Sequence, residues 1–380
     1  MYLVQKTALR YVYVTLLLSL GFLLVACSSA SVQAQPTVAV TQYPPTAQSP
    51  LLSPTPTSPP LLRPDLERGM VYPVWNSEAY GFGDPTWQQG VETMKRETGA
   101  TWVEMPLVLR QSTSSSLDLG PDPNTVTLDA FGNGIQRAVS LGYHVFVVPL
   151  TDVVAHGSWA GVIVYQSQQE LQAWFDRYWN ALKPYAEVAQ QAGAEQMAIG
   201  SELEWLSQNA PASLWNQLIS RVRSVFKGTL TYDMNWWPSL SSLPPSWFKN
   251  PALKEIGLSE YAPLVDSPQR VDPNAMPALW KSRVGKLIDS FAAHVGKPII
   301  LSEIGYRDTS DGLYNPYYGV SSAPVDTQEQ AAAFAAALIN VFADRHIVGI
   351  FFWAWDNVGR LGIVGQQAVQ VVHRWYTKTA

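Results

Sequence analysis

Two glutamates, Glu202 and Glu303, are the residues of this chain best placed to do chemistry. Each lies at the end of a short apolar run with the character of a buried strand, in the segments QMAIGSELE (196–204) and KPIILSEIGY (297–306). A carboxylate at the end of a buried strand costs free energy unless it is paired or used. Two carboxyl groups, one protonated and one ionised, are what the cleavage of a glycosidic bond requires. The two segments therefore predict a site that cleaves glycosidic bonds.

Other interpretations of these carboxylates remain open. Each glutamate could be a surface carboxylate or the partner of a helix N-terminus. Glu204 could be the acid in place of Glu202, which we prefer because it lies nearer the strand end. Glu104, in TWVEMP, is expected to be structural or to hydrogen-bond a substrate. Glu104 and Glu260 are also the carboxylates that could act as the base of an inverting enzyme.

Runs typical of strands alternate with helical runs along the rest of the chain. Most of the strand candidates are continuous apolar runs, as expected in a parallel sheet covered on both faces. They span residues 70–74, 101–107, 144–150, 196–200, 229–234, 255–259, 298–302 and 347–352. Helical spacing covers 85–98, 168–191, 213–226, 328–345 and 366–376.

Eight such strands, with helical runs between them, predict an α/β fold of the (β/α)8 TIM-barrel type. The competing fold, an open doubly wound sheet, would have a glycine-rich phosphate loop after its first strand, and WNSEAYGFG (75–83) is not one. Chemistry in a barrel lies at the carboxyl ends of the strands. Glu202 follows the fourth strand and Glu303 the seventh, so we expect them on opposing sides of the mouth. That placement can give the separation of about 5–5.5 Å found in retaining glycosidases.

The composition narrows the class of partner. The net charge is −5 and no basic cluster is present, which argues against nucleic acid. The five histidines have no metal-binding spacing, so we expect neither a metal nor a cofactor. The chain has 15 tryptophans, most of which should fill the core. An indole face also fits the apolar face of a pyranose, and we expect Trp75 and Trp159 to contact a carbohydrate. We expect the protein to be a monomer.

The amino terminus has the features of an export signal. Lys6 and Arg10 precede an apolar stretch at residues 11–26, which is short for a spanning helix. The sequence Leu-Val-Ala-Cys that ends at Cys27 resembles the lipobox of a bacterial lipoprotein, in which the cysteine is acylated. An ordinary signal peptide with a chance cysteine is the alternative. We expect an extracytoplasmic protein, anchored by lipid at Cys27 to the bacterial cell membrane or cell surface.

A linker separates this signal from the folded domain. Residues 28–62 carry no charge and are rich in Pro, Ser, Thr, Ala and Gln, so they cannot bury a core. Proline keeps such a segment extended. The expected domains are a signal peptide at 1–26, a linker at 27–63 that includes Cys27, and a barrel at 64–380.

The chain resembles glycoside hydrolase family 113, a β-mannanase-like branch of the retaining barrel hydrolases. The resemblance is carried by IGSEL, WNQLISRVR and GTLTYDMN, and then by GLSEYAPL, KPIILSEIGYR and GIFFWAWD. These match the family patterns I-G-T-E-L, W-x-x-L-I-x-x-V-R, G-x-L-T-Y-x-x-N, G-I-D-A-Y-F-P-L, K-P-v-x-f-t-E-I-G-Y-R and G-x-f-x-W-x-W-D. The match covers about residues 69–375, nearly the whole predicted domain.

The resemblance implies roles for particular residues. Glu202 would be the acid/base and Glu303 the nucleophile, while Tyr261 would hydrogen-bond Glu303 and hold it ionised. Trp353 or Trp355 would floor the sugar subsite at which cleavage occurs. Asn235 and Asp152 would contact sugar hydroxyls.

The chain also departs from the family pattern. The third strand of the family ends in K-P-H-V-D, and here the segment is VPLTD (148–152), without the Lys and His. The family's W-R-G is WAG at 159–161, without its Arg, and Ser201 stands where the wider clan favours Asn. These departures leave the glutamate pair intact and affect the expected preference for mannan.

The residues and the resemblance together predict a retaining glycoside hydrolase for a β-linked polysaccharide or oligosaccharide, with β-mannan as the first candidate. The alternative is a non-catalytic carbohydrate-binding surface lipoprotein that kept the barrel. A purely structural envelope lipoprotein would explain neither the carboxylates nor the aromatic strand ends.

Overall fold

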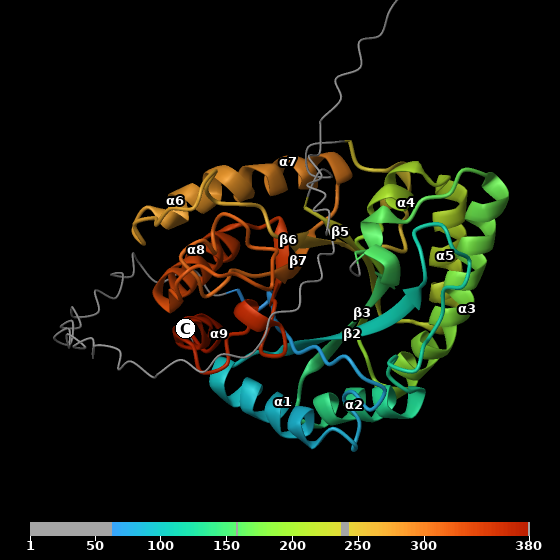
Figure 1. Cartoon of the computed structure of the whole chain (residues 1–380), viewed down its shortest axis with the longest axis horizontal. Coiled ribbons are helices and arrows are strands. Elements are labelled where there is room, and N and C mark those ends of the chain that lie inside the picture. The colour runs from blue at the N-terminus through green and yellow to red at the C-terminus, as the bar shows by residue number, and fades with distance from the viewer. Residues whose placement is uncertain (1–62, 157–158, 237–242, 379–380) are drawn as a thin grey trace, which may run out of the picture. The chain divides into compact units, whose positions relative to one another are not determined.

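The computed structural model describes residues 63–156, 159–236 and 243–378, and these form a closed barrel of eight parallel strands surrounded by helices (Figure 1). The predicted (β/α)8 barrel is therefore confirmed. Each strand pairs with the next along the chain, and the last pairs with the first. The strands are β1 Glu67–Val71, β2 Trp102–Gln111, β3 His144–Val153, β4 Gln196–Ser201, β5 Thr229–Asn235, β6 Ile256–Glu260, β7 Ile299–Ile304 and β8 Ile347–Phe352.

Helices cover the outside of the barrel. Their bounds are α1 Pro85–Thr98, α2 Leu128–Ser140, α3 Gln168–Ala192, α4 Glu204–Asn209, α5 Ala212–Val225, α6 Met276–Trp280, α7 Lys286–Val295, α8 Thr327–Ala343 and α9 Gln367–Tyr376. The start of α1 follows from its sequence: the Asp84 side chain accepts a hydrogen bond from the Trp87 N–H at 3.0 Å, and Pro85 occupies the first turn.

The structure differs from the sequence pattern at β7 and at helices α2, α4, α6 and α7, which no predicted helical run covers. Glu303, expected just past the seventh strand, lies inside β7 as its penultimate residue. Helix α2 is not indicated by the pattern, because Gly132 and Gly134 lower helix propensity. Gly134 is needed for packing: a Cβ built there would lie 2.3 Å from the Cβ of Tyr80. Close packing between α2 and the chain before α1 therefore outweighs propensity.

Apolar side chains fill both the inside and the outside of the barrel. The inner cluster includes Val71, Phe146, Val148, Ile300 and Phe351, all fully buried. A much larger cluster lies between the strands and the helices. The inner cluster closes the barrel to solvent, so a ligand can reach only its ends.

The amino-terminal predictions concern residues outside the described part of the chain. Cys27, the signal peptide and the linker at residues 28–62 lie there. Among the helices that the structure does describe, none has both the length and the apolar character needed to cross a bilayer.

Candidate active site

Glu202 follows β4 directly and has an uncommon backbone conformation. Its φ is +49°, in the left-handed region that non-glycine residues rarely adopt. The Glu202 N–H donates to the carbonyl oxygen of Asp233 on β5 at 2.9 Å, which holds this conformation. Such a backbone costs about 1–3 kcal/mol and is concentrated at functional sites. The strained backbone therefore makes Glu202 a candidate functional residue.

The Glu202 carboxyl group is held from one side by an indole. Trp159, 40% exposed, donates from Nε1 to Oε2 of Glu202 at 3.2 Å. Burial raises the pKa of Glu202 to about 7, and the negative charges of Asp233 and Glu204 act in the same direction. The side chains of Ser259 and Trp159 lower it. Glu202 therefore keeps a proton at a pH where an ordinary glutamate has lost it.

Glu303 lies on the opposite side of the barrel, in β7. It is 7% exposed, and the hydroxyl of Tyr261 donates to its Oε2 at 2.9 Å. Burial raises the pKa of Glu303 well above its usual range, and the charges of Asp233 and Glu202 raise it further. The Tyr261 hydrogen bond opposes this rise by favouring the ionised form.

The contacts around Asp233 show that both glutamates belong to one site. Ser201, the residue before Glu202, donates to Oδ2 of Asp233 at 2.7 Å, and Ser302, the residue before Glu303, donates to Oδ1. Serine side chains from the ends of β4 and β7 thus converge on one buried carboxylate, that of Asp233. The arrangement places a half-buried acid and a buried carboxylate with a tyrosine partner at the same end of the barrel.

Asp233 is the main site residue that sequence reasoning missed. It is fully buried on β5, and burial raises its pKa to about 6, while hydrogen bonds from Ser302, Ser201 and Ser259 lower it. The signal was present in the sequence: a lone carboxylate inside the apolar strand TLTYDMN, the same anomaly that singled out Glu104.

Glu104 lies on β2, fully buried, at the same end of the barrel. Within the described residues, neither of its carboxyl oxygens has a hydrogen-bond partner. Its pKa is raised well above the usual range by burial and by the charges of Glu303 and Asp233. Burial and both neighbouring charges therefore favour the uncharged form of Glu104. The expectation that it hydrogen-bonds a substrate stays a prediction.

The other two carboxylates considered as alternatives lie elsewhere. Glu204 begins α4, and its charge raises the pKa of Tyr232, whose ring packs in the outer core. Glu260 is buried, accepts a hydrogen bond from the Ala262 N–H, and raises the pKa of Tyr306 in the same outer core. Glu260 therefore acts on the layer between barrel and helices, whereas the charge of Glu204 acts on that layer and also on Glu202.

The aromatic residues named from the sequence separate into two groups. Trp353 is half-buried, and its ring centroid lies 6.1 Å from that of Trp75, which is 39% exposed. Trp355 is 2% exposed and packs in the outer core, so its ring face is closed to a ligand. Of the two candidates for the floor of the sugar subsite, the structure leaves Trp353 accessible.

Asp152 and Asn235 lie at the ends of β3 and β5, and both are half-buried. Asp152 is ion-paired with Arg110 of β2, with 3.3 Å between Oδ2 and Nε. Burial raises the pKa of Asp152, and the charge of Arg110 opposes the shift. Asp152 is thus oriented by a neighbouring strand, as a residue that contacts a ligand hydroxyl would need to be.

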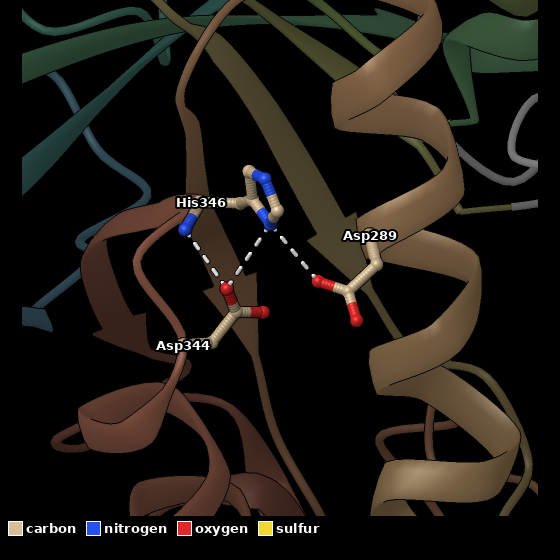
Figure 2. Close-up of side chains that lie close together, drawn as sticks. All are labelled: Asp289, Asp344 and His346. Carbon is tan, nitrogen blue, oxygen red and sulfur yellow. Dashed lines mark hydrogen bonds and ion pairs between the residues drawn. The ribbon is translucent and has the colours of Figure 1, made fainter.

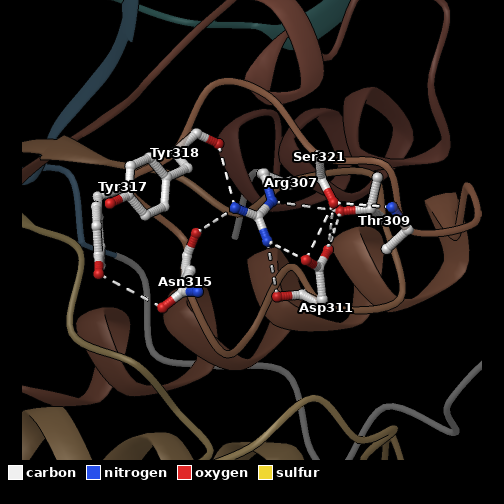
Figure 3. Close-up of polar contacts among 8 residues, drawn as sticks. Arg307, Thr309, Asp311, Asn315, Tyr317, Tyr318 and Ser321 are labelled. Carbon is white, nitrogen blue, oxygen red and sulfur yellow. Dashed lines mark hydrogen bonds and ion pairs between the residues drawn. The ribbon is translucent and has the colours of Figure 1, made fainter. Parts of the chain in front are cut away.

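The loop after β7 is organised around one buried arginine, as Figure 3 shows. Arg307, 2% exposed, donates to the carbonyl oxygen of Asn315 at 2.6 Å and is ion-paired with Asp311 at 2.8 Å. The loop presents Tyr317 and Tyr318, 45% and 54% exposed. The Tyr317 ring lies 6.4 Å from that of Trp236, which follows β5. Sequence reasoning did not single out these rings, because no strand end marks the two tyrosines.

Among the residues that the structure describes, one group of side chains could be considered for a metal ion: Asp289, Asp344 and His346. Figure 2 shows both carboxylates directed at Nδ1 of His346, at 3.1 Å and 3.4 Å. His346 immediately precedes β8, so the group lies at the end of the barrel opposite to Glu202 and Glu303. Both carboxylates are ion-paired with the histidine, at the end of the barrel away from Glu202 and Glu303.

Comparison with known proteins gives a consistent picture. The model of the family described as Glycoside Hydrolase Family 113 matches residues 71–363. A solved structure described as a complex of a GH113 β-1,4-mannanase shares 20% identity, with 83% of this chain and 99% of that chain covered and a TM-score of 0.70. A GH113 β-mannanase from Alicyclobacillus acidocaldarius shares 23% identity, covering 82% and 97%, with a TM-score of 0.69.

A more distant similarity is to a Glycoside Hydrolase Family 5 mannosidase from Rhizomucor miehei, at 12% identity, 82% and 92% coverage and a TM-score of 0.55. These structural similarities concern the fold. No curated protein matches the chain.

Proposed function

This chain belongs to glycoside hydrolase family 113 and is a glycoside hydrolase, and on that premise we propose that it cleaves β-linked polysaccharide or oligosaccharide by double displacement, with retention of configuration. Glu202 is the acid/base and Glu303 the nucleophile. The observation that carries the proposal is the pairing of two glutamates at the ends of β4 and β7, one bonded to Trp159 and the other to Tyr261. Family membership alone does not assign these roles.

The proposed reaction has two steps. In the first, a carboxylate oxygen of Glu303 bonds to the anomeric carbon, the glycosidic C–O bond breaks, and Glu202 donates its proton to the leaving oxygen. In the second, Glu202 accepts a proton from water, the water oxygen bonds to the anomeric carbon, and Glu303 leaves as a carboxylate. Both steps conserve protons, and the anomeric configuration is inverted twice.

The proton must be on Glu202 when the first step begins. Burial raises the pKa of both glutamates, and the charge of Glu202 raises that of Glu303, so the pair favours holding a proton between them. Substrate binding would place that proton on Glu202, because the glycosidic oxygen accepts a hydrogen bond there. Positive charge that develops at the anomeric carbon stabilises the ionised Glu303, together with the hydroxyl of Tyr261.

We expect kcat/KM to follow a narrow bell-shaped dependence on pH. The acid must be protonated, so activity should fall as pH rises through the pKa of Glu202, which is about 7. The nucleophile must be ionised, and because its pKa is raised, activity should fall on acidification at a pH above the ordinary glutamate range. Initial rates measured from about pH 4 to about pH 9 test this. Activity that stays constant from pH 6 to pH 9 would contradict the role given to Glu202.

We propose β-mannan as the first substrate to test, and the support comes from the family and its mannanase members. The chain itself departs at β3: the segment before Asp152 is Leu150-Thr151, with Thr151 buried and Leu150 packed against the inner cluster. No cationic side chain lies in that segment to contact a sugar hydroxyl. The preference for mannose over glucose is therefore less fixed than the cleavage chemistry.

A screen of the purified protein against β-mannan, glucomannan, β-glucan and xylan tests this function. We expect reducing ends to appear with mannan or glucomannan. Cleavage of β-glucan or xylan alone would support hydrolase activity and would refute β-mannan as the substrate. Binding of all four without cleavage of any would favour the alternative, a non-catalytic carbohydrate-binding protein.

We propose that the protein is anchored to the bacterial membrane by lipid on Cys27, with residues 28–62 as a spacer between membrane and barrel. The support is the sequence alone. The Cys27→Ser variant should carry no lipid and should leave the membrane fraction, because one apolar stretch of about 16 residues is too short to span. Mass spectrometry of the amino-terminal peptide and fractionation of cells test this. Membrane retention equal to that of wild type would refute the anchor.

A further inference from the structure

The carboxylate of Asp233 links three strands of the barrel. Its Oδ2 accepts hydrogen bonds from Ser201 of β4 at 2.7 Å and from Ser259 of β6 at 3.1 Å. Its Oδ1 accepts a hydrogen bond from Ser302 of β7. All four side chains are buried. An anion inside a barrel costs free energy unless its acceptor sites are filled, and three hydroxyl donors fill them here.

Two of the three links reach the residues immediately before the proposed catalytic pair. Ser201 precedes Glu202 and Ser302 precedes Glu303. The main chain of Asp233 adds a third contact, since its carbonyl oxygen accepts the Glu202 N–H at 2.9 Å. Asp233 of β5 thus hydrogen-bonds both the backbone of Glu202, in its left-handed conformation, and the side chain of Ser302, next to Glu303.

These links lie where the regular strand pairing is interrupted. The register between β4 and β5 shifts between Ala198 and Ser201, and that between β6 and β7 shifts between Gly257 and Ser259. Gly257 leaves the space for the links: a Cβ there would lie 2.8 Å from the Ser302 hydroxyl and 3.1 Å from Cα of Asp233. The serine–Asp233 hydrogen bonds therefore connect these strands where their main-chain pairing is irregular.

The charge of Asp233 acts on three other carboxyl groups of the site, those of Glu202, Glu303 and Glu104. It raises the pKa of Glu202 and of Glu303, the next cause after burial in each case, and it also raises that of Glu104 on β2. On its own strand it raises the pKa of Tyr232. The other groups that face this cluster are Glu204, which acts on Glu202, and Tyr261, which is bonded to Glu303. Within the described part of the chain, no lysine, arginine or histidine is among the causes of these shifts.

We propose that Asp233 is a positioning residue, which ties the strand ends of Glu202 and Glu303 together and places a negative charge between them. This role rests on the function proposed above. The three donated hydroxyls favour the ionised form of Asp233. Above a pH of about 6, the negative charge of Asp233 helps Glu202 to retain the proton that it must donate, and the Tyr261 hydroxyl offsets the same effect at Glu303. Because its side chain is fully buried, we assign Asp233 no contact with the sugar.

The Asp233→Asn variant tests the charge. It keeps an acceptor oxygen and the side-chain volume, and it removes the negative charge. Both limbs of the bell should then move to lower pH by about one unit, because loss of a neighbouring negative charge lowers the pKa of both glutamates. The measurement is kcat/KM against pH, on the substrate cleaved fastest in the screen. If Asp233 had only a structural role, the variant would have a lower kcat/KM at every pH, and the two pKa values of the pH profile would be unchanged.

A matched control is Glu255→Gln, at the opposite end of β6. Glu255 is also buried and accepts a hydrogen bond from Gln196 at 2.6 Å. Burial raises the pKa of Glu255 to about 7, so it too titrates within the range measured, but it lies away from the mouth and its substitution should not move the bell. A shift equal to that of Asp233→Asn would show a general charge effect and overturn the proposal, as would an unmoved bell in Asp233→Asn.

The Ser302→Ala variant tests the hydrogen bond between Ser302 and Asp233 separately from the charge. It also provides a test if the Asp233→Asn variant does not fold. It keeps Asp233 and cuts its link to the residue before Glu303. We expect kcat to fall by about tenfold or more at the optimum, with KM and the unfolding temperature little changed, because a small displacement of a reacting group is costly. A wild-type kcat would refute the positioning role. Failure of the proposed function itself is distinguishable, since the wild-type enzyme would then cleave none of the four polysaccharides.

Discussion

The Glu303→Gln variant should lose nearly all turnover, by roughly 10⁴-fold or more, with every substrate. Glutamine has the size of glutamate and can still accept the hydrogen bond from Tyr261, so the fold and the pocket should be kept. It cannot attack the anomeric carbon as an anion, and no covalent intermediate can form. Because this step precedes any other, a better leaving group should not restore the rate.

The matched control for this variant is Glu260→Gln. Glu260 is buried on the neighbouring strand β6, where it lies opposite Ile304 of β7. Its charge raises the pKa of Tyr306, which packs between the barrel and the helices. We expect this variant to retain most of its activity. If instead Glu260→Gln is inactive and Glu303→Gln is active, the nucleophile has been assigned to the wrong face of the sheet. Thermal unfolding of both proteins checks that they are folded.

The Glu202→Gln variant should show a loss that depends on the leaving group. With natural oligosaccharides, whose leaving oxygen needs a proton, kcat/KM should fall by about 10²–10⁴-fold. With a dinitrophenyl β-glycoside the first step needs no proton, so a rapid burst of dinitrophenolate should precede a slow steady state. The burst reports glycosylation of Glu303, and the slow phase reports hydrolysis without a general base.

The control here is Glu204→Gln, which tests the alternative acid two residues along the chain. Its side chain acts on Tyr232 and only secondarily on Glu202, so we expect a modest change in rate with no dependence on the leaving group. Leaving-group dependence in Glu204→Gln, together with equal loss for every leaving group in Glu202→Gln, would transfer the acid role to Glu204.

The fold could be predicted from the sequence because the strands of this barrel are short, apolar and regularly spaced. Each of the eight strand candidates overlaps an observed strand, and Glu202 and Glu303 lie at the barrel mouth as expected. Parallel strands covered on both faces leave a clear pattern, and a carboxylate at the end of such a strand is conspicuous.

The organisation within the mouth could not be predicted in the same way. Asp233, Ser201, Ser259 and Ser302 come from four strands, and their contacts depend on register shifts that no local pattern encodes. Trp353 and Trp355 lie beyond the last residue of β8, where the alternation of strand faces no longer applies. The sequence therefore left both as candidates, and tertiary packing buried one of them.

The stereochemistry of the first product tests the central claim most directly. Double displacement through Glu303 requires that the anomeric configuration be kept, whereas a single displacement by water inverts it and needs the carboxyl groups about 6.5–9.5 Å apart. The measurement is proton NMR of the reducing end formed in the first minutes of cleavage of a β-linked oligosaccharide, before mutarotation mixes the anomers. Retention predicts that the β-anomer appears first and the α-anomer only later. If the α-anomer appears first, the enzyme inverts, and Glu303 is a general base rather than a nucleophile.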